Sequence, residues 1–514
     1  MTDDNLYSLL DRSFAVAGSK TAIRSPSGDL KLSYAELRRN ASRYANALVA
    51  LGVEPGDRVT VQVEKSIANV LLYLAVLKVG AVYQPLNSAY TDTELDYFLG
   101  DAEPKVFVCD PFRQPGVRGF SGRHKIIAVL NLEGKGEESL ASLAGRMDDH
   151  HQTVTRAVDD LAGLLYTSGT TGRSKGAMIT HGNLTSNAQA LVKIWNIREK
   201  DVLLHALPLF HVHGLYVALN TAFLSGSEII WFEKFEAAAV AAAFPQATLM
   251  MGVPTFYARL LASRDLTREA CRNMRLFISG SAPLAPETHR EFGVRTGHAL
   301  LERYGMTETG MITSNPLDGE RIAGTVGFAL PAVSVRIAGA QPGVVEVKGP
   351  NVFKGYWRNP EKTAEEFTQD GYFITGDVGT MGRDGRVSIV DRVKDIIISG
   401  GLNIYPKEIE AALDAIPGIA ESAVVGVPHP DLGEGVIAAV TASGPLASEP
   451  EIIAALATCL AKFKVPKRIF VLENLPRNAM GKVQKAELRK RYGTVFTGGS
   501  GDQPAAIDFA VSSD

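Results

Sequence analysis

One loop of the sequence carries the residue types that a phosphate-binding site needs. Residues 166–176 read YTSGTTGRSKG and follow a short apolar run. The glycines leave backbone N–H groups unobstructed, the serine and threonine hydroxyls can donate hydrogen bonds, and a lysine adds positive charge; such groups cradle polyphosphates. The loop therefore predicts a polyphosphate site with these candidate residues: Thr167, Ser168, Gly169, Thr170, Thr171, Gly172 and Lys175.

The spacing within this loop separates it from a Walker A loop, because the Gly-to-Gly spacing and the Gly-Lys-Ser/Thr ending are missing. The alternative is a mobile surface loop, which is what most loops rich in glycine, serine and threonine are. Two adjacent threonines so close to a lysine favour phosphate binding.

The elements that must position this loop alternate between strand and helix. Residues 57–63 have the pattern of a strand, 66–79 carry apolar residues at helical spacing, and 81–86 return to strand. Such alternation favours an α/β fold of parallel sheets covered by helices, with ligands in loops at the carboxyl ends of the strands. Further strands are expected at 106–109, 161–166, 228–232, 248–253 and 276–279.

The pattern changes after residue 326 and predicts three parts of the chain. Shorter strands between Gly and Asp turns indicate a β subdomain at 326–392, which closes a large N-terminal domain of residues 1–392. A small α+β domain is predicted over 393–495, and a disordered tail rich in Gly, Ser, Asp and Ala over 496–514. The small domain is expected to contain helices at 407–415 and 449–462 and strands at 421–427 and 467–473.

Composition and charge exclude several classes of protein. The 514 residues are 46% hydrophobic and 21% charged, which is typical of a globular protein with an ample core. A net charge of −3 gives no electrostatic footprint for nucleic acid or an anionic membrane, and no apolar stretch is long enough to span a bilayer. Cys109, Cys271 and Cys459 lie far apart and argue against a zinc site or disulfides. We therefore expect a cytoplasmic protein without a signal peptide.

The loop and several later segments resemble the motifs of the acyl-adenylate-forming superfamily, which comprises acyl-CoA synthetases, firefly luciferases and the adenylation domains of nonribosomal peptide synthetases. The resemblance covers residues 5–492, with the motifs in the family's order. It implies an enzyme that joins a carboxylate to the α-phosphate of ATP, releases pyrophosphate and passes the acyl group to a thiol. The segments are 208–214 (PLFHVHG), 279–284 (SGSAPL), 304–309 (YGMTET), 374–377 (ITGD), 391–396 (DRVKDI), 399–405 (SGGLNIY) and 476–482 (PRNAMGK).

That chemistry needs cations and hydrogen-bond donors more than a base, because the carboxylate is already ionised and negative charge builds on the phosphorus oxygens. The resemblance implies that Thr307 donates to the α-phosphate, Glu308 holds Mg²⁺, and Lys482 reaches the carboxylate and α-phosphate during adenylation. Tyr304 would stack on adenine and Asp377 would accept from the ribose hydroxyls. The other nucleotide-binding residues that it implies are Ser281, Ala282, Pro283, Glu302, Arg303, Gly305, Met306 and Arg392.

The same resemblance implies a C-terminal domain that moves. Lys394 matches the hinge about which this domain rotates between the two half-reactions. One state would bring in Lys482, and the other would place Gly400 and Gly401 close to the thiol of coenzyme A. Glycine suits that loop because its backbone can approach a ligand closely.

The acyl pocket is assigned in two ways. From the residues alone, Arg259 is a candidate because residues 250–261 read as a strand end followed by a helix that Pro254 opens. A guanidinium at that place can bind a second, distal carboxylate, and the alternative is an arginine that extends over apolar neighbours to solvent. The residues that match the family's acyl pocket are His211, also expected to be catalytic, Ser279, Gly280, Met306 and Ile312.

Segments such as GVPTFYARLL and HALLERYGMTET are most similar to malonyl-CoA synthetases. In that group an arginine matching Arg259 reads the far carboxylate of malonate or methylmalonate. A monocarboxylate would leave this arginine buried and unpaired, which is costly. This chain departs from the group at Gly310 and Ile312, where relatives carry asparagine. The loss of two amides could widen and dry the pocket for a C2-substituted malonate or a different short acid.

Three functions stay open on the sequence. The first is an AMP-forming acid–thiol ligase for malonate or methylmalonate that uses ATP, Mg²⁺ and coenzyme A. The second keeps this chemistry on another short, branched or aryl acid. The third is an adenylation or acyl-AMP-sensing protein that makes no CoA ester, which the presence of Lys482, Gly401 and Lys394 disfavours. We expect no nucleic-acid or membrane partner, and a monomer or weak dimer.

Overall fold

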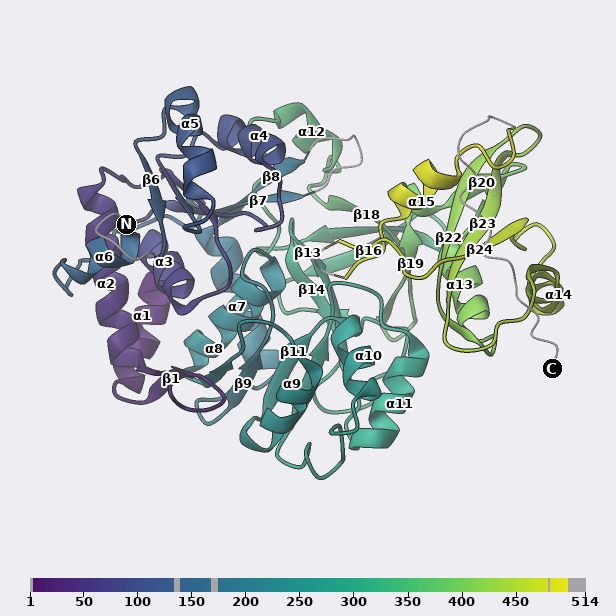
Figure 1. Ribbon diagram of the computed structural model, residues 1–514, viewed down its shortest axis with the longest axis horizontal. Helices are drawn as coiled ribbons and strands as arrows, with labels where there is room; N and C mark the ends of the chain where they lie inside the picture. The colour runs from purple at the N-terminus through teal and green to yellow at the C-terminus, as the bar shows by residue number, and fades with distance from the viewer. Residues whose placement is uncertain (1–2, 134–138, 168–173, 479–480, 498–514) are drawn as a thin grey trace. The chain divides into compact units, whose positions relative to one another are not determined.

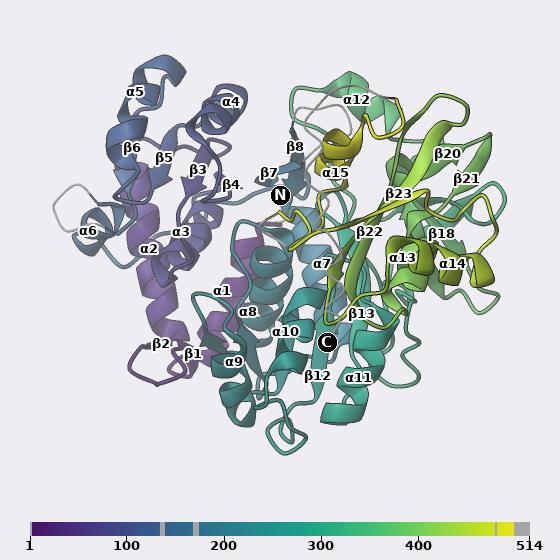
Figure 2. The same ribbon diagram turned by 45° about the vertical axis from the view of Figure 1, so that its right-hand side comes forward.

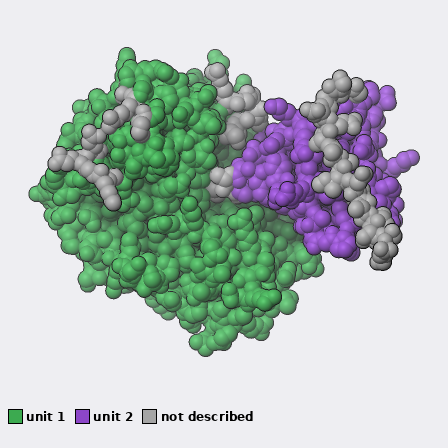
Figure 3. Space-filling model, viewed as in Figure 1, with its two compact units in different colours: residues 1–336, 346–374, 382–387 green, residues 337–345, 375–381, 388–514 purple. Residues whose placement is uncertain are grey.

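The computed structural model describes residues 3–133, 139–167, 174–478 and 481–497, which form two compact units (Figure 3). A four-stranded sheet of order β16-β17-β18-β19 lies within the predicted β subdomain. Its strands are β16 (Ser334–Ala338), β17 (Gly343–Lys348), β18 (Phe373–Met381) and β19 (Val387–Arg392). Unit 1 comprises residues 1–336, 346–374 and 382–387, and unit 2 comprises 337–345, 375–381 and 388–514.

A six-stranded sheet of order β6-β5-β3-β4-β7-β8 holds the predicted phosphate loop at one edge. Its neighbours pair in parallel except β7 and β8, which form an antiparallel hairpin around the loop. The central strands are buried on both faces, which explains their near-continuous apolar sequence. The strands are β3 (Arg58–Gln62), β4 (Val82–Pro85), β5 (Val106–Cys109), β6 (Ala128–Asn131), β7 (Leu161–Thr167) and β8 (Lys175–Thr180).

A nine-stranded sheet of order β15-β14-β13-β12-β11-β9-β10-β1-β2 forms the other half of unit 1. Its interior pairs are parallel, and antiparallel pairs occur at β13–β14, β14–β15 and β1–β2. The strands are β1 (Thr21–Arg24), β2 (Lys31–Ser33), β9 (Val202–His205), β10 (Glu228–Trp231), β11 (Leu249–Gly252), β12 (Leu276–Ser279), β13 (Leu301–Met306), β14 (Gly310–Ser314) and β15 (Phe328–Ala329).

Three helices cover one face of this sheet: α9 (Ala237–Ala243), α10 (Pro254–Ala262) and α11 (Pro286–Thr296) (Figure 1). Their apolar sides share a core with β9 to β12 in which Phe244, Tyr257 and Phe277 are fully buried. Proline opens α10 and α11, where its missing N–H would have no helical partner.

The remaining helices of unit 1 begin at side-chain caps in several places. Ser33, Thr91 and Thr180 each accept a hydrogen bond from the backbone three residues on, and the residue there bonds back to the cap. Figure 2 shows α4 and α5 beside each other. The helices are α1 (Leu6–Ala17), α2 (Tyr34–Ala50), α3 (Ile67–Lys78), α4 (Asp92–Ala102), α5 (Gln114–His124), α6 (Leu140–Gly145), α7 (His181–Ile194), the π-helix η1 (His213–Leu219), α8 (Asn220–Ser225), the 3₁₀ turn η2 (Phe244–Gln246) and α12 (Pro360–Glu365).

Unit 2 is built on a sheet of order β21-β20-β23-β22, with β24 paired in parallel to β23. Helices α13 and α14 share one apolar core with this sheet, and α15 packs in a second core that includes Leu472, Leu475 and Tyr492. The elements are the 3₁₀ turn η3 (Val393–Asp395), β20 (Ile397–Ser399), β21 (Leu402–Ile404), α13 (Pro406–Asp414), β22 (Ile419–His429), β23 (Gly433–Ala442), α14 (Glu449–Cys459), β24 (Arg468–Val471) and α15 (Lys485–Tyr492).

These elements confirm the predicted fold class, a large α/β part with parallel-rich sheets and a smaller α+β unit. The strands predicted at 106–109 and 276–279 are β5 and β12, and the helix predicted at 66–79 is α3. Across the described ranges, no helix is both long and apolar enough to cross a membrane.

Candidate active site

Glu308 stands at the turn between β13 and β14, where the two sheets of unit 1 meet. Thr167, the last residue of β7, donates from Oγ1 to Glu308 Oε1 at 3.0 Å. The Tyr356 hydroxyl lies 3.3 Å from the same oxygen and donates to Glu366 at 2.6 Å. Glu308 is only 6% exposed, so its carboxylate is held in one place by groups from both sheets.

Lys175 begins β8 on the far side of the phosphate loop. Its Nζ lies 3.2 Å from Glu366 Oε1 and 4.4 Å from the centre of the Tyr356 ring. Burial alone would raise the pKa of Glu366, but hydrogen bonds from Tyr356 and Lys175 hold that pKa below its usual value. Burial and the two carboxylates raise the pKa of Tyr356, which keeps its hydroxyl a donor. The predicted residues Ser168, Gly169, Thr170, Thr171 and Gly172 lie outside the described residues.

The segment after β12 adopts an unusual backbone at the predicted adenine site. Ser281 has φ of 73°, which is rare for a residue other than glycine, and its Oγ lies 3.2 Å from His213 Nδ1. Leu284 N donates to Glu302 Oε1 at 3.2 Å, which fixes the turn containing Ala282 and Pro283 on β13. The structure therefore brings the predicted 281–283 segment next to the strand that carries Tyr304.

Arg303 is the buried cation of this region. It is 3% exposed, and its Nε and Nη2 have no hydrogen-bond partner among the described residues. A Cβ on Gly280 would stand 2.5 Å from Arg303 Cζ, so a larger residue there would displace the guanidinium. Burial lowers the pKa of Arg303 to about 9. A guanidinium without a partner in a buried site is costly unless a ligand pairs with it.

Two further buried polar groups accompany Arg303. The side chains of Ser279 and His213 are both buried, and Ser279 Oγ and His213 Nε2 lack a partner within the described part of the chain. Burial, together with the nearby charge of Arg303, lowers the pKa of His213 well below its usual value, so the ring is neutral at neutral pH. The sequence interpretation passed over His213, although it lies in the same motif as His211, whose Nδ1 accepts from the His213 backbone at 3.3 Å.

Arg259 and Ile312, two residues of the predicted acyl pocket, differ in burial. Arg259 is exposed, because Tyr257 and Leu260 occupy the buried face of α10. Ile312 is fully buried on β14. Met306 ends β13, and Thr307 follows it directly.

A small cavity of about 20 Å³ lies beside Thr307 and Gly310. It is large enough for one water molecule. Gly310 has φ of 56°, and a Cβ there would stand 2.8 Å from Asn187 Oδ1. The residues that line the cavity are Ile179, Asn183, Leu184, Asn187, Val212, Tyr216, Thr307, Gly310 and Asn351.

Unit 2 holds the predicted ribose and lysine residues in one cluster. Asp377 is 3% exposed, and its Oδ1 lies 2.9 Å from Arg392 Nε. Burial, reinforced by the cations Arg392, Lys394 and Lys407, lowers the pKa of Lys482 to about 8. The Lys482 backbone N donates to Asn478 Oδ1 at 3.0 Å, which anchors the loop that carries this lysine.

The predicted hinge and thiol-step residues lie at two turns of unit 2. Lys394 is in the 3₁₀ turn η3, next to Asp395, which pairs with Arg489 at 2.7 Å. Gly400 and Gly401 connect β20 to β21 with φ values of 58° and 78°, the left-handed conformation that a tight two-residue hairpin requires.

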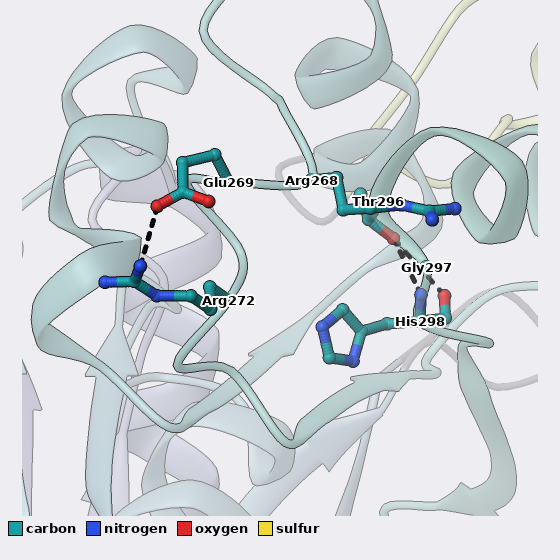
Figure 4. Close-up of a pocket in the computed structure, with 6 residues that line it drawn as sticks. All are labelled: Arg268, Glu269, Arg272, Thr296, Gly297 and His298. Atoms are coloured by element: carbon teal, nitrogen blue, oxygen red, sulfur yellow. Dashed lines mark hydrogen bonds and ion pairs between the residues drawn. The ribbon is translucent and has the colours of Figure 1, made fainter.

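A separate surface pocket of about 490 Å³ contains none of the predicted site residues (Figure 4). Arg268, Glu269 and Arg272 are exposed there, and Glu269 pairs with Arg272 at 2.9 Å. The other lining residues, Thr296, Gly297 and His298, lie at the end of α11, where carbonyl oxygens disfavour an anion.

These features agree with the relationship of the chain to known proteins. The chain belongs to the AMP-binding enzyme family, which it matches over residues 10–357, and it matches the C-terminal domain of AMP-binding enzymes over 408–482. It is an AMP-forming acyl-CoA ligase similar to malonyl-CoA synthetases.

Individual relatives differ in the acid that their names state. A feruloyl-CoA synthase of Amycolatopsis is 38% identical over 92% of this chain and 96% of that protein. The malonate–CoA ligase of Arabidopsis thaliana is 34% identical over 88% of this chain and 80% of that protein. The crystal structure of ATP-bound MatB from Rhodopseudomonas palustris is 50% identical, covers 96% of this chain and 100% of that one, and has a TM-score of 0.93.

Proposed function

We propose that this ligase acts on malonate or methylmalonate. The observation that carries the proposal is the buried guanidinium of Arg303, which lies against Gly280 with two donor nitrogens unpaired among the described residues. A dicarboxylate offers a second carboxylate that can pair with it in a bidentate manner. A neutral or apolar tail would leave the charge buried and unpaired, which strongly disfavours other acids.

The arrangement around Arg303 suits a short diacid. Ser279 Oγ and His213 Nε2 are buried polar atoms of the same region, so they can satisfy the remaining oxygens of a distal carboxylate. Because the His213 ring is neutral, Arg303 supplies the positive charge and His213 supplies a hydrogen bond. The role assigned to Arg259 therefore passes to Arg303 in this proposal.

In the first half-reaction, an oxygen of the substrate carboxylate attacks the α-phosphorus of ATP, and the bond to pyrophosphate breaks. Thr307 donates to the α-phosphate, and Lys482 stabilises the charge that develops on the carboxylate and phosphate oxygens. In the second half-reaction, the thiol sulfur of coenzyme A bonds to the acyl carbon and AMP leaves. Asp377 accepts from the ribose hydroxyls in both steps.

Mg²⁺ fits the residues around Glu308. Magnesium in nucleotide sites is commonly held by one or two carboxylates together with substrate phosphates and water. Glu308 offers one such carboxylate, held by Thr167 and Tyr356 beside the ends of the phosphate loop. When bound, the ion neutralises phosphate charge. No group of three or more His, Cys, Asp or Glu residues suited to a metal occurs in the described ranges.

Residues of unit 2 have roles in the thioester-forming step. Gly400 and Gly401 form a turn without side chains, past which the pantetheine arm of coenzyme A can run close to the backbone. Lys394 lies in a single 3₁₀ turn between β19 and β20, where a change of a few backbone angles can rotate the rest of the unit.

A different acid is the second candidate, and Gly310 favours it. This residue has no side chain beside the 20 Å³ cavity, so the acyl region has room that a larger residue would take. A feruloyl-CoA synthase is also among the relatives. The buried charge of Arg303 weighs against an aryl acid and is compatible with a C2-substituted malonate.

The test is thioester formation with malonate, methylmalonate, ethylmalonate, acetate, butyrate and benzoate. We would compare the wild type with Arg303→Met and, as matched control, Arg259→Met. We expect the wild type to prefer diacids by on the order of 10²-fold or more. Arg303→Met should lose this preference while still activating butyrate, which also shows that it folds, and Arg259→Met should retain it.

Two outcomes would contradict the proposal. If the wild type uses malonate and butyrate equally well, the protein is still an acyl-CoA ligase, but its substrate is another acid. If only Arg259→Met loses the preference for diacids, then Arg259 on α10, and not Arg303, recognises the distal carboxylate.

A further inference from the structure

Lys65 connects the two sheets of unit 1. It follows β3 of the six-stranded sheet, yet its ammonium donates to the carbonyl oxygens of His205 at 2.9 Å and Phe232 at 2.6 Å. These two residues lie at the carboxyl ends of β9 and β10 in the nine-stranded sheet. The ammonium also lies 2.9 Å from His205 Nδ1 and 4.1 Å from the centre of the Trp231 ring.

The partners of His205 fix where its proton resides. Its Nε2 lies 3.0 Å from the carbonyl oxygen of Gly214, which can only accept, so Nε2 carries the hydrogen. Nδ1 is then an acceptor, and the three protons of the Lys65 ammonium meet three acceptors. Stacking on Trp231, with ring planes 15° apart, holds the imidazole flat. Gly214 and Lys65 thus together determine the tautomer of His205, and Lys65 and Trp231 hold its ring in position.

Gly214 links this pair to the acyl region. It is the second residue of the π-helix η1, and the first residue is His213. Short π-helical turns are rare and are frequently found at functional sites. A Cβ on Gly214 would collide with the Pro208 carbonyl, so the turn is packed tightly and transmits a displacement of its carbonyl to its neighbours.

We propose that Lys65 and His205 are positioning residues for acid binding, which fix the Gly214 carbonyl so that His213 meets Ser281 on one side and the acid on the other. Neither residue touches substrate. The role of His213 in binding the acid rests on the proposed function, but the positioning of η1 applies to any acid that the enzyme activates. A plain structural staple between the sheets is the competing explanation.

Substitutions at His205 separate the two explanations. His205→Gln places an amide where Nε2 stands, so it can still donate to the Gly214 carbonyl. His205→Asn is shorter; it keeps an acceptor for Lys65 and loses the bond to Gly214. Both variants keep part of the link between the sheets. If Lys65 and His205 only staple the sheets together, the two variants should have similar effects on acid binding. If they position η1, the two effects should differ.

The measurements are KM for the acid, KM for ATP, kcat and the melting temperature, with the acid that the wild type activates best. We expect Lys65→Met and His205→Asn to raise KM for the acid by on the order of tenfold, because small displacements at a binding site are costly. KM for ATP should rise less than KM for the acid, although Ser281 contacts His213, and His205→Gln should recover most of the affinity for the acid. Lys78→Met is the matched control, because Lys78 is another buried lysine beside an aromatic ring, 4.5 Å from the centre of Tyr7.

An unchanged KM for the acid in His205→Asn, or equal effects of His205→Asn and His205→Gln, would overturn the positioning role. If Lys65→Met fails to fold, the two His205 variants still decide. Because the acid is chosen by the wild-type screen, poor use of malonate would contradict the proposed function without affecting this test.

Discussion

Thr167 Oγ1 donates a 3.0 Å hydrogen bond to Glu308 Oε1 although the two residues are 141 positions apart in the sequence. Thr167 ends a strand of the six-stranded sheet, and Glu308 lies in a turn of the nine-stranded sheet. The phosphate loop therefore starts at the carboxylate that we assign to magnesium, and this side-chain contact helps to hold the two parts of the nucleotide site in register.

Thr167→Val tests this contact with a side chain of nearly the same shape. We expect a loss of about 1 kcal/mol of stability, since Glu308 keeps its contact with Tyr356. We also expect KM for MgATP to rise several-fold while KM for the acid stays the same. Steady-state kinetics at several Mg²⁺ concentrations would show it, and an effect confined to the acid would contradict the assignment.

Gly280→Ala should impair acid binding. The new Cβ would stand 2.5 Å from Arg303 Cζ, so the guanidinium must move. We expect kcat/KM for the acid to fall about tenfold or more, with KM for ATP little changed. Gly293→Ala on α11 is the control, because nothing lies within 4 Å of its Cβ. Normal diacid kinetics in Gly280→Ala would show that Arg303 does not bind the acid.

The rate of adenylation should fall as the pH rises through about 8, because Lys482 has its pKa lowered to that value from 10.5 and acts as a cation. Lys482→Arg should move this fall to higher pH. Single-turnover formation of pyrophosphate against pH measures it, and an identical profile in the arginine variant would rule out titration of this lysine as the cause.

The lowered pKa of Lys482 also affects stability, which should rise with pH whereas the rate of adenylation falls. Between about 8 and 10.5 the unfolded chain binds more protons at Lys482 than the folded chain does, so this group makes stability increase with pH over that interval. Subtracting the urea unfolding profile of Lys482→Met from that of the wild type should isolate this slope. A flat difference would mean that folding does not lower the pKa of Lys482.

Gly310→Ala should destabilise the protein by about 1–3 kcal/mol, because alanine resists a positive φ and its Cβ would press on Asn187. Thermal unfolding measures this change. Asparagine tolerates a positive φ better than alanine does. Gly310→Asn should therefore destabilise the backbone less than Gly310→Ala, while its side chain fills the space beside the cavity. A Gly310→Asn variant that uses ethylmalonate as well as the wild type does would show that residue 310 does not limit the acid.

Much of the fold followed from local sequence. Strands such as β5 and β12 are short apolar runs that parallel sheets bury on both faces, and Pro254 marks the start of α10 because proline is tolerated in the first helical turn. The order of the motifs along the sequence identified the family. Several of these motifs lie in loops at the carboxyl ends of these strands.

The acyl pocket was harder to predict, because burial of a particular arginine depends on contacts that are distant in sequence. Arg259 lies on a helix whose inner face is occupied by Tyr257 and Leu260, so it is exposed. Arg303 is buried because β12 pairs with β13 and Gly280 leaves room for the guanidinium. The ion pair of Lys175 with Glu366 likewise spans 191 positions, and no local pattern indicates it.

The β7–β8 hairpin has a consequence for engineering. Thr167 and Lys175 face each other in the strand ladder, and each is tied to a different carboxylate, Glu308 and Glu366. The segment between them is therefore attached at two fixed points that do not depend on its own sequence. Substitutions in that segment would therefore leave the contacts of Thr167 and Lys175 with the two carboxylates in place.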